Sequence, residues 1–192
     1  MIKMAYIGLA FPTFAKLDQV TNTYSDGFRF GKAVSVNATI NYNEASLSGD
    51  NVIAESVREF RNGTIDLGIT TIPVEAYSTV FGHEVTTDGV DGAVTIVDKT
   101  DDIAHYGGLG LVKQEMVDGD RKHIAMWFKK VQFTETGENA TTKGETITFQ
   151  APTISGNIFA LDDMTWRERK IFDTQEEAVA YIDGMAGIVP EV

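Results

Sequence analysis

Apolar and polar residues alternate along three stretches of the chain, residues 34–40, 64–69 and 146–150. Successive side chains of a strand point to opposite faces, so each stretch predicts a strand with one buried face and one wet face. This pattern is typical of antiparallel sheets. Further strands are predicted at 93–97, 106–116, 124–133, 154–161 and 166–172. The fold class that follows is mainly β, a β-sandwich or barrel-like fold of two packed antiparallel sheets.

Two local signals bear on how the predicted strands pair. Asp118-Gly119 lies between two of them, and Gly accepts the positive φ that a tight hairpin turn needs. Residues 167–170, Arg-Glu-Arg-Lys, place charge on both faces of a short strand. Such charge protects an exposed sheet edge from unwanted pairing, although the same edge is available for pairing inside an assembly.

Two flanking helices are predicted. Pro73 opens the first, because the N–H it lacks would have no partner there, and Gly82 is placed to end it. The second is expected to begin at Asp173, with Glu176 completing a capping box. Its inward stripe is predicted to be Ala178, Tyr181, Ile182 and Met185.

Residues 41–62 are the least regular part of the sequence, with many polar and charged residues and only scattered apolar ones. A structureless loop of that length is uncommon in a compact domain. The segment is therefore either a long protruding hairpin or a loop that orders against a partner. Residues 134–143 form a second, shorter polar loop rich in Thr and Glu.

The composition narrows the function classes. The chain has 192 residues, with 16 basic and 28 acidic side chains, a formal net charge of −12 and no Cys. Its length suits one domain with a real core. The lack of Cys excludes disulfides, thiolate catalysis, zinc fingers and iron–sulfur clusters. The acidic balance argues against a nucleic-acid-binding surface, because such surfaces concentrate Lys and Arg.

Residues that often carry chemistry occur here without supporting motifs. The three His residues, His83, His105 and His123, show no close metal-ligand spacing, and structural or solvent-facing roles are expected. The glycine run at 107–110 lacks the ending of a phosphate loop, so we interpret it as a curved or closely packed strand. Residues 98–102 offer calcium ligands but lack the Gly and distal Glu of an EF-hand, which favours a solvated turn. No cofactor or metal is expected.

Nothing in the sequence argues for an enzyme. There is no Gly-x-Ser-x-Gly elbow for a hydrolase triad. A hydrolase that uses Asp98, Asp101 or His105 stays an alternative, but no nucleophile–base spacing supports it. An acidic, β-rich domain with a long loop and no evident chemistry is instead typical of an interaction or structural protein.

Several segments from about Ile7 to Ile182 carry a family resemblance. They are 31–40 (GKAVSVNATI), 44–47 (EASL), 51–56 (NVIAES), 127–133 (WFKKVQF), 142–154 (TKGETITFQAPTI) and the charged strand that leads into 172–174 and an Ala-rich helix. In their order and number, these segments resemble the siphophage major tail protein family, the tail tube subunit of phages that infect Gram-positive bacteria.

The resemblance implies a phage tail tube fold of two packed β-sheets with a flanking helix. It implies a single tail-tube domain over residues 1–192, without the immunoglobulin-like domain that some relatives append. It further implies a structural subunit whose copies form rings, six copies to a ring, with inner strands joined into one continuous barrel. The rings would stack around a tape-measure protein into a tube that conducts DNA into the host.

The implied partners are further copies of the chain and the tape-measure, tail-tip and tail-terminator proteins. DNA is expected only in non-specific transit, and no membrane binding is expected. The implied location is the virion tail, after assembly in the host cytoplasm. Acidic side chains on the lumen face would repel DNA phosphates, but the sequence does not label that face.

Two loops are the candidate contact sites under this interpretation. The long loop or hairpin at about 41–62 is expected to reach the next ring, and its candidate contacts are Leu47, Asp50, Asn51, Ile53, Glu55 and Arg58. The second loop offers Glu135, Glu138, Asn139 and Lys143. Two alternatives stay open: a monomeric β-sandwich binding module with a ligand loop at 41–62, and a tube subunit of a contractile tail or defective-phage particle.

Overall fold

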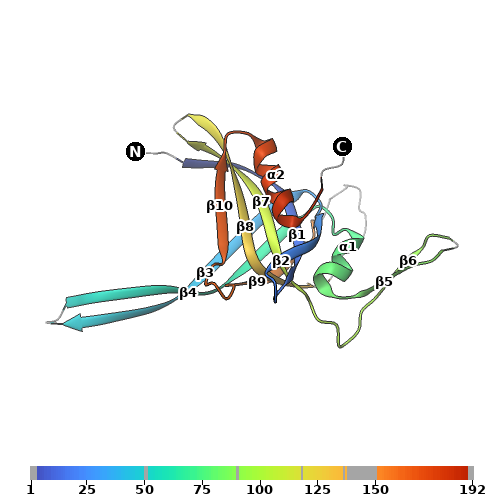
Figure 1. Ribbon diagram of the computed structural model, residues 1–192, viewed down its shortest axis with the longest axis horizontal. Coiled ribbons are helices and arrows are strands. Elements are labelled where there is room, and N and C mark those ends of the chain that lie inside the picture. Colours follow the sequence, from blue (N-terminus) through green and yellow to red (C-terminus); the bar gives the residue numbers. More distant parts are fainter. Residues whose placement is uncertain are drawn as a thin grey trace, which may run out of the picture.

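The computed structural model describes residues 4–49, 52–89, 91–117, 119–135, 137 and 151–189. Most of these residues lie in strands, and two short helical regions flank them (Figure 1). The strands are β1 (Met4–Asp18), β2 (Thr23–Arg29), β3 (Ala33–Gly49), β4 (Val52–Ile69), β5 (Glu84–Thr87), β6 (Val94–Val97), β7 (Tyr106–Val117), β8 (Asp120–Thr134), β9 (Thr153–Phe159) and β10 (Arg167–Phe172). The helices are α1 (Val74–Ala76), which continues as a π-helical turn η1 (Tyr77–Phe81), and α2 (Gln175–Ala186).

Eight of these strands form one antiparallel sheet in the order β2-β1-β7-β8-β9-β4-β3, with β10 joined to β8, and β5 and β6 form a separate ribbon. The large sheet curls so that its two ends approach each other. The Phe30 N–H donates to the Pro12 carbonyl at 2.9 Å and the Gly31 N–H to the Thr71 carbonyl at 3.1 Å, which ties the segment between β2 and β3 to both ends. The mainly β fold class with flanking helices is confirmed.

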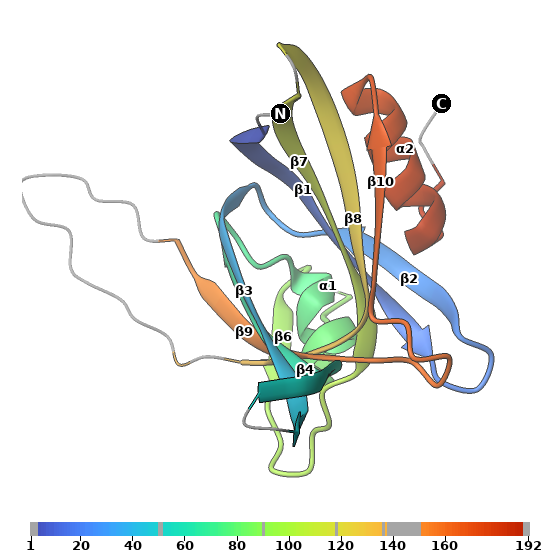
Figure 2. The ribbon, with the colours of Figure 1, turned by 90° about the vertical axis from the view of Figure 1, so that its left-hand side faces the viewer.

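The main core fills the inside of this curl. Phe14 of β1 lies 6.1 Å from Phe133 of β8, measured between ring centroids, and Phe30 lies 6.3 Å from the same ring. Val80 and Phe81 of η1 are buried in the same cluster, so the helical turn closes one side of the curl (Figure 2). Strands β4, β7, β8 and β9 add Ile65, Leu67, Ile69, Leu109, Leu111, Met126, Phe128, Val131, Ile154 and Ile158.

A second, smaller core lies on the outside of the sheet, under α2. Ala178, Ile182 and Ala186 pack on β1, β7 and β8, where Trp127 is fully buried. The glycine run allows this packing, because a Cβ at Gly108 would meet the Trp127 ring. Cβ atoms at the neighbouring positions would likewise meet Phe14, at Gly107, and Ile182, at Gly110. The interpretation of this run as a closely packed strand is confirmed.

The helix boundaries agree with the sequence in one case and differ in the other. Gly82 ends the first helix with φ +82°, as predicted. The cap of α2 is Thr174, not Asp173: the Glu177 N–H donates to Thr174 Oγ1 at 3.3 Å, and Glu177 Oε2 accepts from the Thr174 N–H. Asp173 instead accepts a hydrogen bond from Lys122 Nζ at 2.5 Å, and this cross-strand ion pair holds its carboxylate away from the helix end.

Apart from the strand at 146–150, every predicted strand corresponds to part of β3, β4 or one of β6 to β10, and the predicted ends extend at most two residues beyond the observed ones. The prediction at 146–150 lies outside the described residues. Gly119 has φ +95° and joins β7 to β8 in the predicted hairpin. The charged run at 167–170 lies in β10, which pairs with β8 on one side and with no other strand among the described residues.

Candidate assembly surfaces

The stretch at 41–62 is a long hairpin formed by the outer halves of β3 and β4. The two strands pair from Ala33 and Ile69 out to Gly49 and Val52, with register shifts near Val34, Arg61 and Ala54. The hairpin projects from the body along the longest axis of the molecule (Figure 1). Of the two forms predicted for this segment, the structure therefore shows the protruding hairpin. Backbone pairing between β3 and β4 stabilises it.

The two faces of the hairpin differ in character. Ala45 pairs directly with Val57 and Leu47 with Glu55, so these four side chains share one face. Leu47 is 64% and Val57 55% exposed, although both are apolar. We call Ala45, Leu47 and Val57 the apolar hairpin face, and it is the part of the hairpin that favours contact with another molecule.

On the opposite face of the hairpin, the charged and aromatic side chains contact one another. Arg58 Nε lies 2.8 Å from Glu44 Oε1, and its guanidinium lies 4.2 Å from the centre of the Tyr42 ring. Nearer the body, Phe60 stacks on Trp166 at 4.6 Å between ring centroids. Among the candidate contacts, Leu47 and Glu55 lie on the apolar face and Arg58 on this one. Ile53 pairs with Ser48 through its backbone, and Asp50 and Asn51 lie outside the described residues.

The second predicted loop is described only at its start. Glu138, Asn139 and Lys143 lie outside the described residues. Glu135 contacts His83 of the same chain, with Glu135 Oε2 at 3.0 Å from His83 Nε2. This contact joins the end of β8 to the segment that follows η1.

His83 is surrounded by carboxylates. Its Nδ1 lies 2.7 Å from Asp102 Oδ2 and 3.6 Å from Asp98 Oδ1, while its Nε2 faces Glu135. Burial opposes a charge on the imidazole, but the hydrogen bonds to Asp102 and Glu135 and the nearby Asp98 outweigh it and raise the pKa of His83. Because each ring nitrogen faces a carboxylate oxygen, the arrangement suits the doubly protonated imidazolium. The same contact with His83 lowers the pKa of Asp102.

This cluster anchors the base of the β5–β6 ribbon, which projects from the body on the side opposite the β3–β4 hairpin (Figure 1). Lys99 Nζ binds Glu84 Oε2 at 2.5 Å, and the Lys99 N–H donates to Asp102 Oδ2 at 2.8 Å. The segment at 98–102 is therefore a turn in which Asp102 is used by His83 and Lys99. In the part of the chain that the structure describes, no three His, Asp or Glu side chains are arranged so that they could hold one metal ion.

The outer face of β3, β4 and β9, beyond the area that α2 covers, is open and polar. Within the body, residues 35–41, 62–68 and 153–157 place only one ionisable side chain on it, Asp66, which accepts a hydrogen bond from Ser155 Oγ at 2.6 Å. We call this surface the polar sheet face, and its other side chains are Ser35, Asn37, Thr39, Asn41, Asn62, Thr64, Thr153, Ser155 and Asn157.

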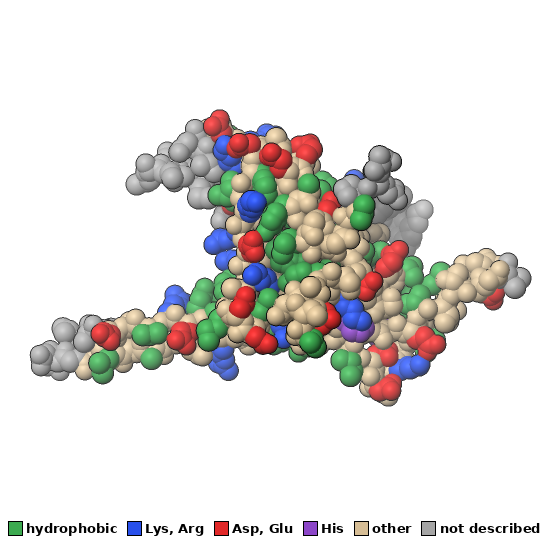
Figure 3. Space-filling view, in the orientation of Figure 1, with side chains coloured by type: hydrophobic (Ala, Val, Ile, Leu, Met, Phe, Trp, Pro, Cys, Tyr) green, Lys and Arg blue, Asp and Glu red, His purple; other side chains and the backbone are tan. Residues whose placement is uncertain are grey.

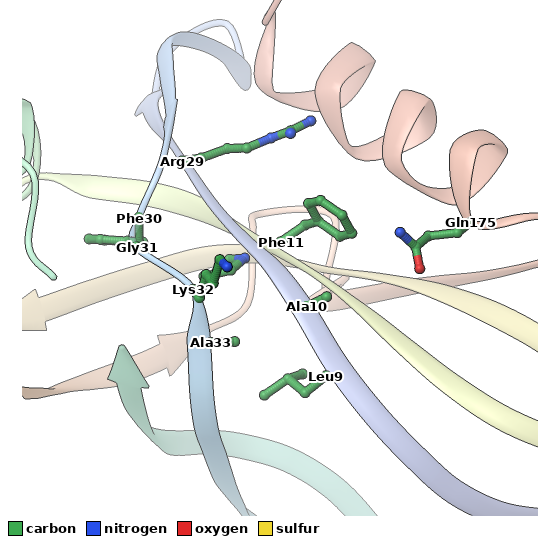
Figure 4. A pocket seen from close by; sticks show the side chains of 10 residues that line it. Leu9, Ala10, Phe11, Arg29, Phe30, Gly31, Lys32, Ala33 and Gln175 are labelled. Carbon is green, nitrogen blue, oxygen red and sulfur yellow. The ribbon is translucent and has the colours of Figure 1, made fainter. Parts of the chain in front are cut away.

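An open pocket of about 500 Å³ lies where β1, the β2–β3 connection and the start of α2 meet. Phe11 and Gln175 point toward each other across it, and Arg29 extends toward α2 (Figure 4). The Arg29 guanidinium is already held by both carboxylate oxygens of Asp183. The hairpin does not line this pocket, so the pocket is separate from the ligand loop of the binding-module alternative.

The residues of the enzyme alternative are not gathered into one site. Asp98 faces His83, whereas the His105 N–H donates to the Val80 carbonyl at 2.9 Å. Burial lowers the pKa of His105, and Lys16 adds to this effect. No hydrogen bond or ion pair joins His105 to Asp98 or Asp101 within the described ranges. Among the described helices, none has the length and apolar character needed to cross a bilayer.

No family model matches the sequence, and no curated protein matches it significantly.

Sequence reasoning did not foresee two of these surfaces. The His83 cluster joins residues 52 positions apart, and its only local signal was the position of His83 after the Gly82 helix stop. The polar sheet face did have a signal, since Asn and Thr alternate with apolar residues at 34–41 and 62–69.

Proposed function

We propose that this chain is the structural subunit of a phage tail tube. Its copies form rings, six to a ring, that stack around a tape-measure protein, and the finished tube conducts DNA. The tail-tip and tail-terminator proteins are the partners at the two ends of the tube. The protein is assembled in the host cytoplasm and then belongs to the virion. The proposal is supported by the family resemblance of the sequence segments and by the surfaces described above.

One observation carries the proposal more than any other, the free edge of β3. This strand spans 17 residues and pairs with β4 alone among the described strands. It contains no Lys, Arg or Pro and a single acid, Glu44, although natural edge strands are commonly protected by such residues. An unprotected edge of that length is suited to pairing with a second copy, and a sheet edge disappears when copies close into a barrel.

The hairpin and the polar sheet face fit the same role. The apolar hairpin face extends beyond the body, where the next ring of a stack would lie. The polar sheet face is the candidate wall of the bore, because its amides and hydroxyls, with one acid, give DNA phosphates no cation to bind. A cationic wall would instead retain the DNA.

The test is electron microscopy of the purified chain, alone and after addition of the tape-measure and tail-tip proteins. The expected result is hollow tubes of uniform diameter, with an axial repeat of one ring. A chain that stays monomeric under both conditions would contradict the proposal and favour the monomeric binding module. A contractile sheath around the tubes in intact particles would instead assign the chain to a contractile tail.

A further inference from the structure

The β5–β6 ribbon and one face of β10 carry opposite charges, and each includes charged side chains that make no ion pair in the described part of the chain. Figure 3 shows most of the visible Lys and Arg side chains on the β10 side of the molecule, with Asp and Glu side chains among them, and mainly Asp and Glu side chains around the β5–β6 ribbon on the other side. Because the chain as a whole has a net charge of −12, a basic region on its surface is unexpected and suggests a specific role.

The acidic surface is the projecting ribbon with its connecting turns, residues 83–89 and 91–103, which we call the acidic arm. It contains six carboxylates against one Lys. Lys99 and His83 engage Glu84, Asp98 and Asp102 at its base. Asp91 and Asp101 have no Lys, Arg or His within ion-pair distance in the described part of the chain. Exposed apolar side chains accompany them: Val94 at 46%, Val97 at 40% and Ile103 at 76%.

The basic surface is one face of β10. Arg167, Arg169 and Ile171 alternate along the strand and lie opposite Phe128, Met126 and Ile124 of β8, so they share a face. We call these three side chains the basic corner, because Trp166, just before them, stacks on Phe60 at the root of the hairpin.

The basic corner lacks an anionic partner of its own. Within the described ranges, neither Arg167 nor Arg169 makes an ion pair, and the neighbouring Arg169 adds to burial in lowering the pKa of Arg167. Ile171 is 60% exposed. Glu168 does not neutralise the two Arg residues, because it lies on the other face and binds the Tyr181 hydroxyl at 2.5 Å.

We propose that the acidic arm of one copy docks against the basic corner of a second copy, with Ile171 packed on the exposed apolar side chains of the arm. The two surfaces lie on opposite sides of the molecule, so they cannot meet within one chain (Figure 1). The β3–β4 hairpin projects on the corner's side of the body, so the arm of one copy would reach the corner of the next beside that hairpin (Figure 1). Such a head-to-tail contact uses different patches on the two copies and builds rings or open chains.

This interface rests on the proposed self-assembly and names one of its contacts. Complementary charge steers association and fixes which surfaces meet, and like charges at the same place oppose it. A nucleic acid is the other polyanion that a basic corner would accept, but the net charge of the whole chain opposes it.

The test uses two charge-reversed proteins, one with Asp91→Lys and Asp101→Lys on the arm, the other with Arg167→Glu and Arg169→Glu at the corner. Each alone is expected to self-associate roughly tenfold more weakly than wild type in sedimentation velocity at low salt. An equimolar mixture of the two variants is expected to self-associate as strongly as wild type. In an assembly in which the two variants alternate, every contact between arm and corner joins opposite charges. A control matched to the arm variant, Asp120→Lys with Glu176→Lys, changes the net charge by the same amount away from both surfaces and should associate as wild type.

Three results would overturn the interface: wild type that stays monomeric at high concentration in low salt, reversed variants that associate as wild type, or a mixture that does not recover. Loss of binding to a short DNA duplex in the corner variant, with self-association intact, would assign the corner to nucleic acid instead. Tubes that still form from the corner variant would leave the proposed function standing and remove only this contact. A recovering mixture without tubes, even with the tail-tip and tape-measure proteins, would support the interface and count against the tail tube role.

Discussion

His83 is the residue whose environment departs most from what its sequence neighbourhood suggests. A His after a helix stop was expected to be structural or solvent-facing, and it is indeed a structural residue that joins two segments. Its partners come from the turn before β7 and from the end of β8, so no local pattern indicates them. As a consequence, we expect part of the folding stability to depend on the protonation of the His83 imidazole.

We predict that His83→Gln removes a pH-dependent part of the stability. The pKa of His83 is raised in the folded protein, so the folded state holds the proton more tightly than the unfolded chain. The stabilisation is therefore complete below about pH 6.5, the ordinary pKa of His, and is lost as the pH rises through the raised value. Hydrogen bonds to charged groups set its size at about 1–3 kcal/mol.

The measurement is urea unfolding of wild type and His83→Gln from pH 5.5 to 9. The difference in the free energy of unfolding should be largest at the acidic end and shrink toward pH 9. Glu135→Gln, which removes one of the two carboxylates hydrogen-bonded to the His83 ring, should show part of the same effect. A constant difference across the pH range would show that the imidazole does not titrate in this cluster.

Other individual residues were only partly predictable. The glycine run was interpreted correctly, because three Gly in a strand indicate close packing whatever the neighbour is. The burial of Asp183 was not predicted, because it depends on Arg29, which lies 154 positions away in sequence. The capping box was placed one residue early, because Asp173 and Thr174 are both good caps and only the ion pair to Lys122 decides between them.

At the scale of elements, the strands that alternate regularly were predicted and the irregular ones were missed. Strand β1 was not predicted, because its alternation breaks where its pairing with β7 shifts between Ala10 and Thr13. Phe11 there has φ +56°, an uncommon conformation for a residue other than Gly, and Pro12 follows it. Strands β2 and β5 are short and mostly polar, so they have no clear period. The hairpin was offered as one of two forms, because its strands lack a buried face to reveal the register.

The hairpin gives a prediction that separates its two faces. We expect Leu47→Asp with Val57→Asp to abolish tube growth, because both side chains lie on the apolar hairpin face. The matched control is Ser46→Asp with Ser56→Asp, a directly paired position on the opposite face whose side chains are also exposed. All four side chains lie outside the core, so thermal unfolding of the two variants should stay close to that of wild type.

The measurement is the mass of sedimentable tubes after addition of tail-tip and tape-measure proteins. Equal loss in both variants would mean that charge on the hairpin, not its apolar face, controls assembly. Normal growth of both would remove the hairpin from the contact between rings.

At the scale of the whole molecule, the charge is uneven in a way that the composition did not show. The sequence divides its acids evenly along the chain, yet in space six of the 28 lie on the acidic arm while the polar sheet face holds Asp66 alone. The sequence alone did not show which acids would face the lumen; under the proposed function, the polar sheet face makes the bore wall mostly neutral and polar. Folding decides this distribution, because strands distant in sequence contribute to each face.

We predict that Asp66→Lys slows DNA ejection and spares tube assembly. The substitution places a cation from each copy on the proposed bore wall, where it would attract passing phosphates. Asp120→Lys, which makes the same change on the β7–β8 turn, is the control. Ejection is followed by dye fluorescence from particles built with each variant. Equal ejection rates would show that the polar sheet face does not line the bore.

The continuity of β3 and β4 from the core into the hairpin has a mechanical consequence. Strand β4 spans 18 residues, or about 60 Å at roughly 3.3 Å per residue, and its inner part carries Ile65 and Leu67 in the core. Sliding the hairpin by one residue would turn those side chains out to solvent, so the register resists a pull along the strands. The hairpin is therefore a stiff strut clamped at one end rather than a tether, and a load applied at its tip is delivered directly to the hydrophobic core.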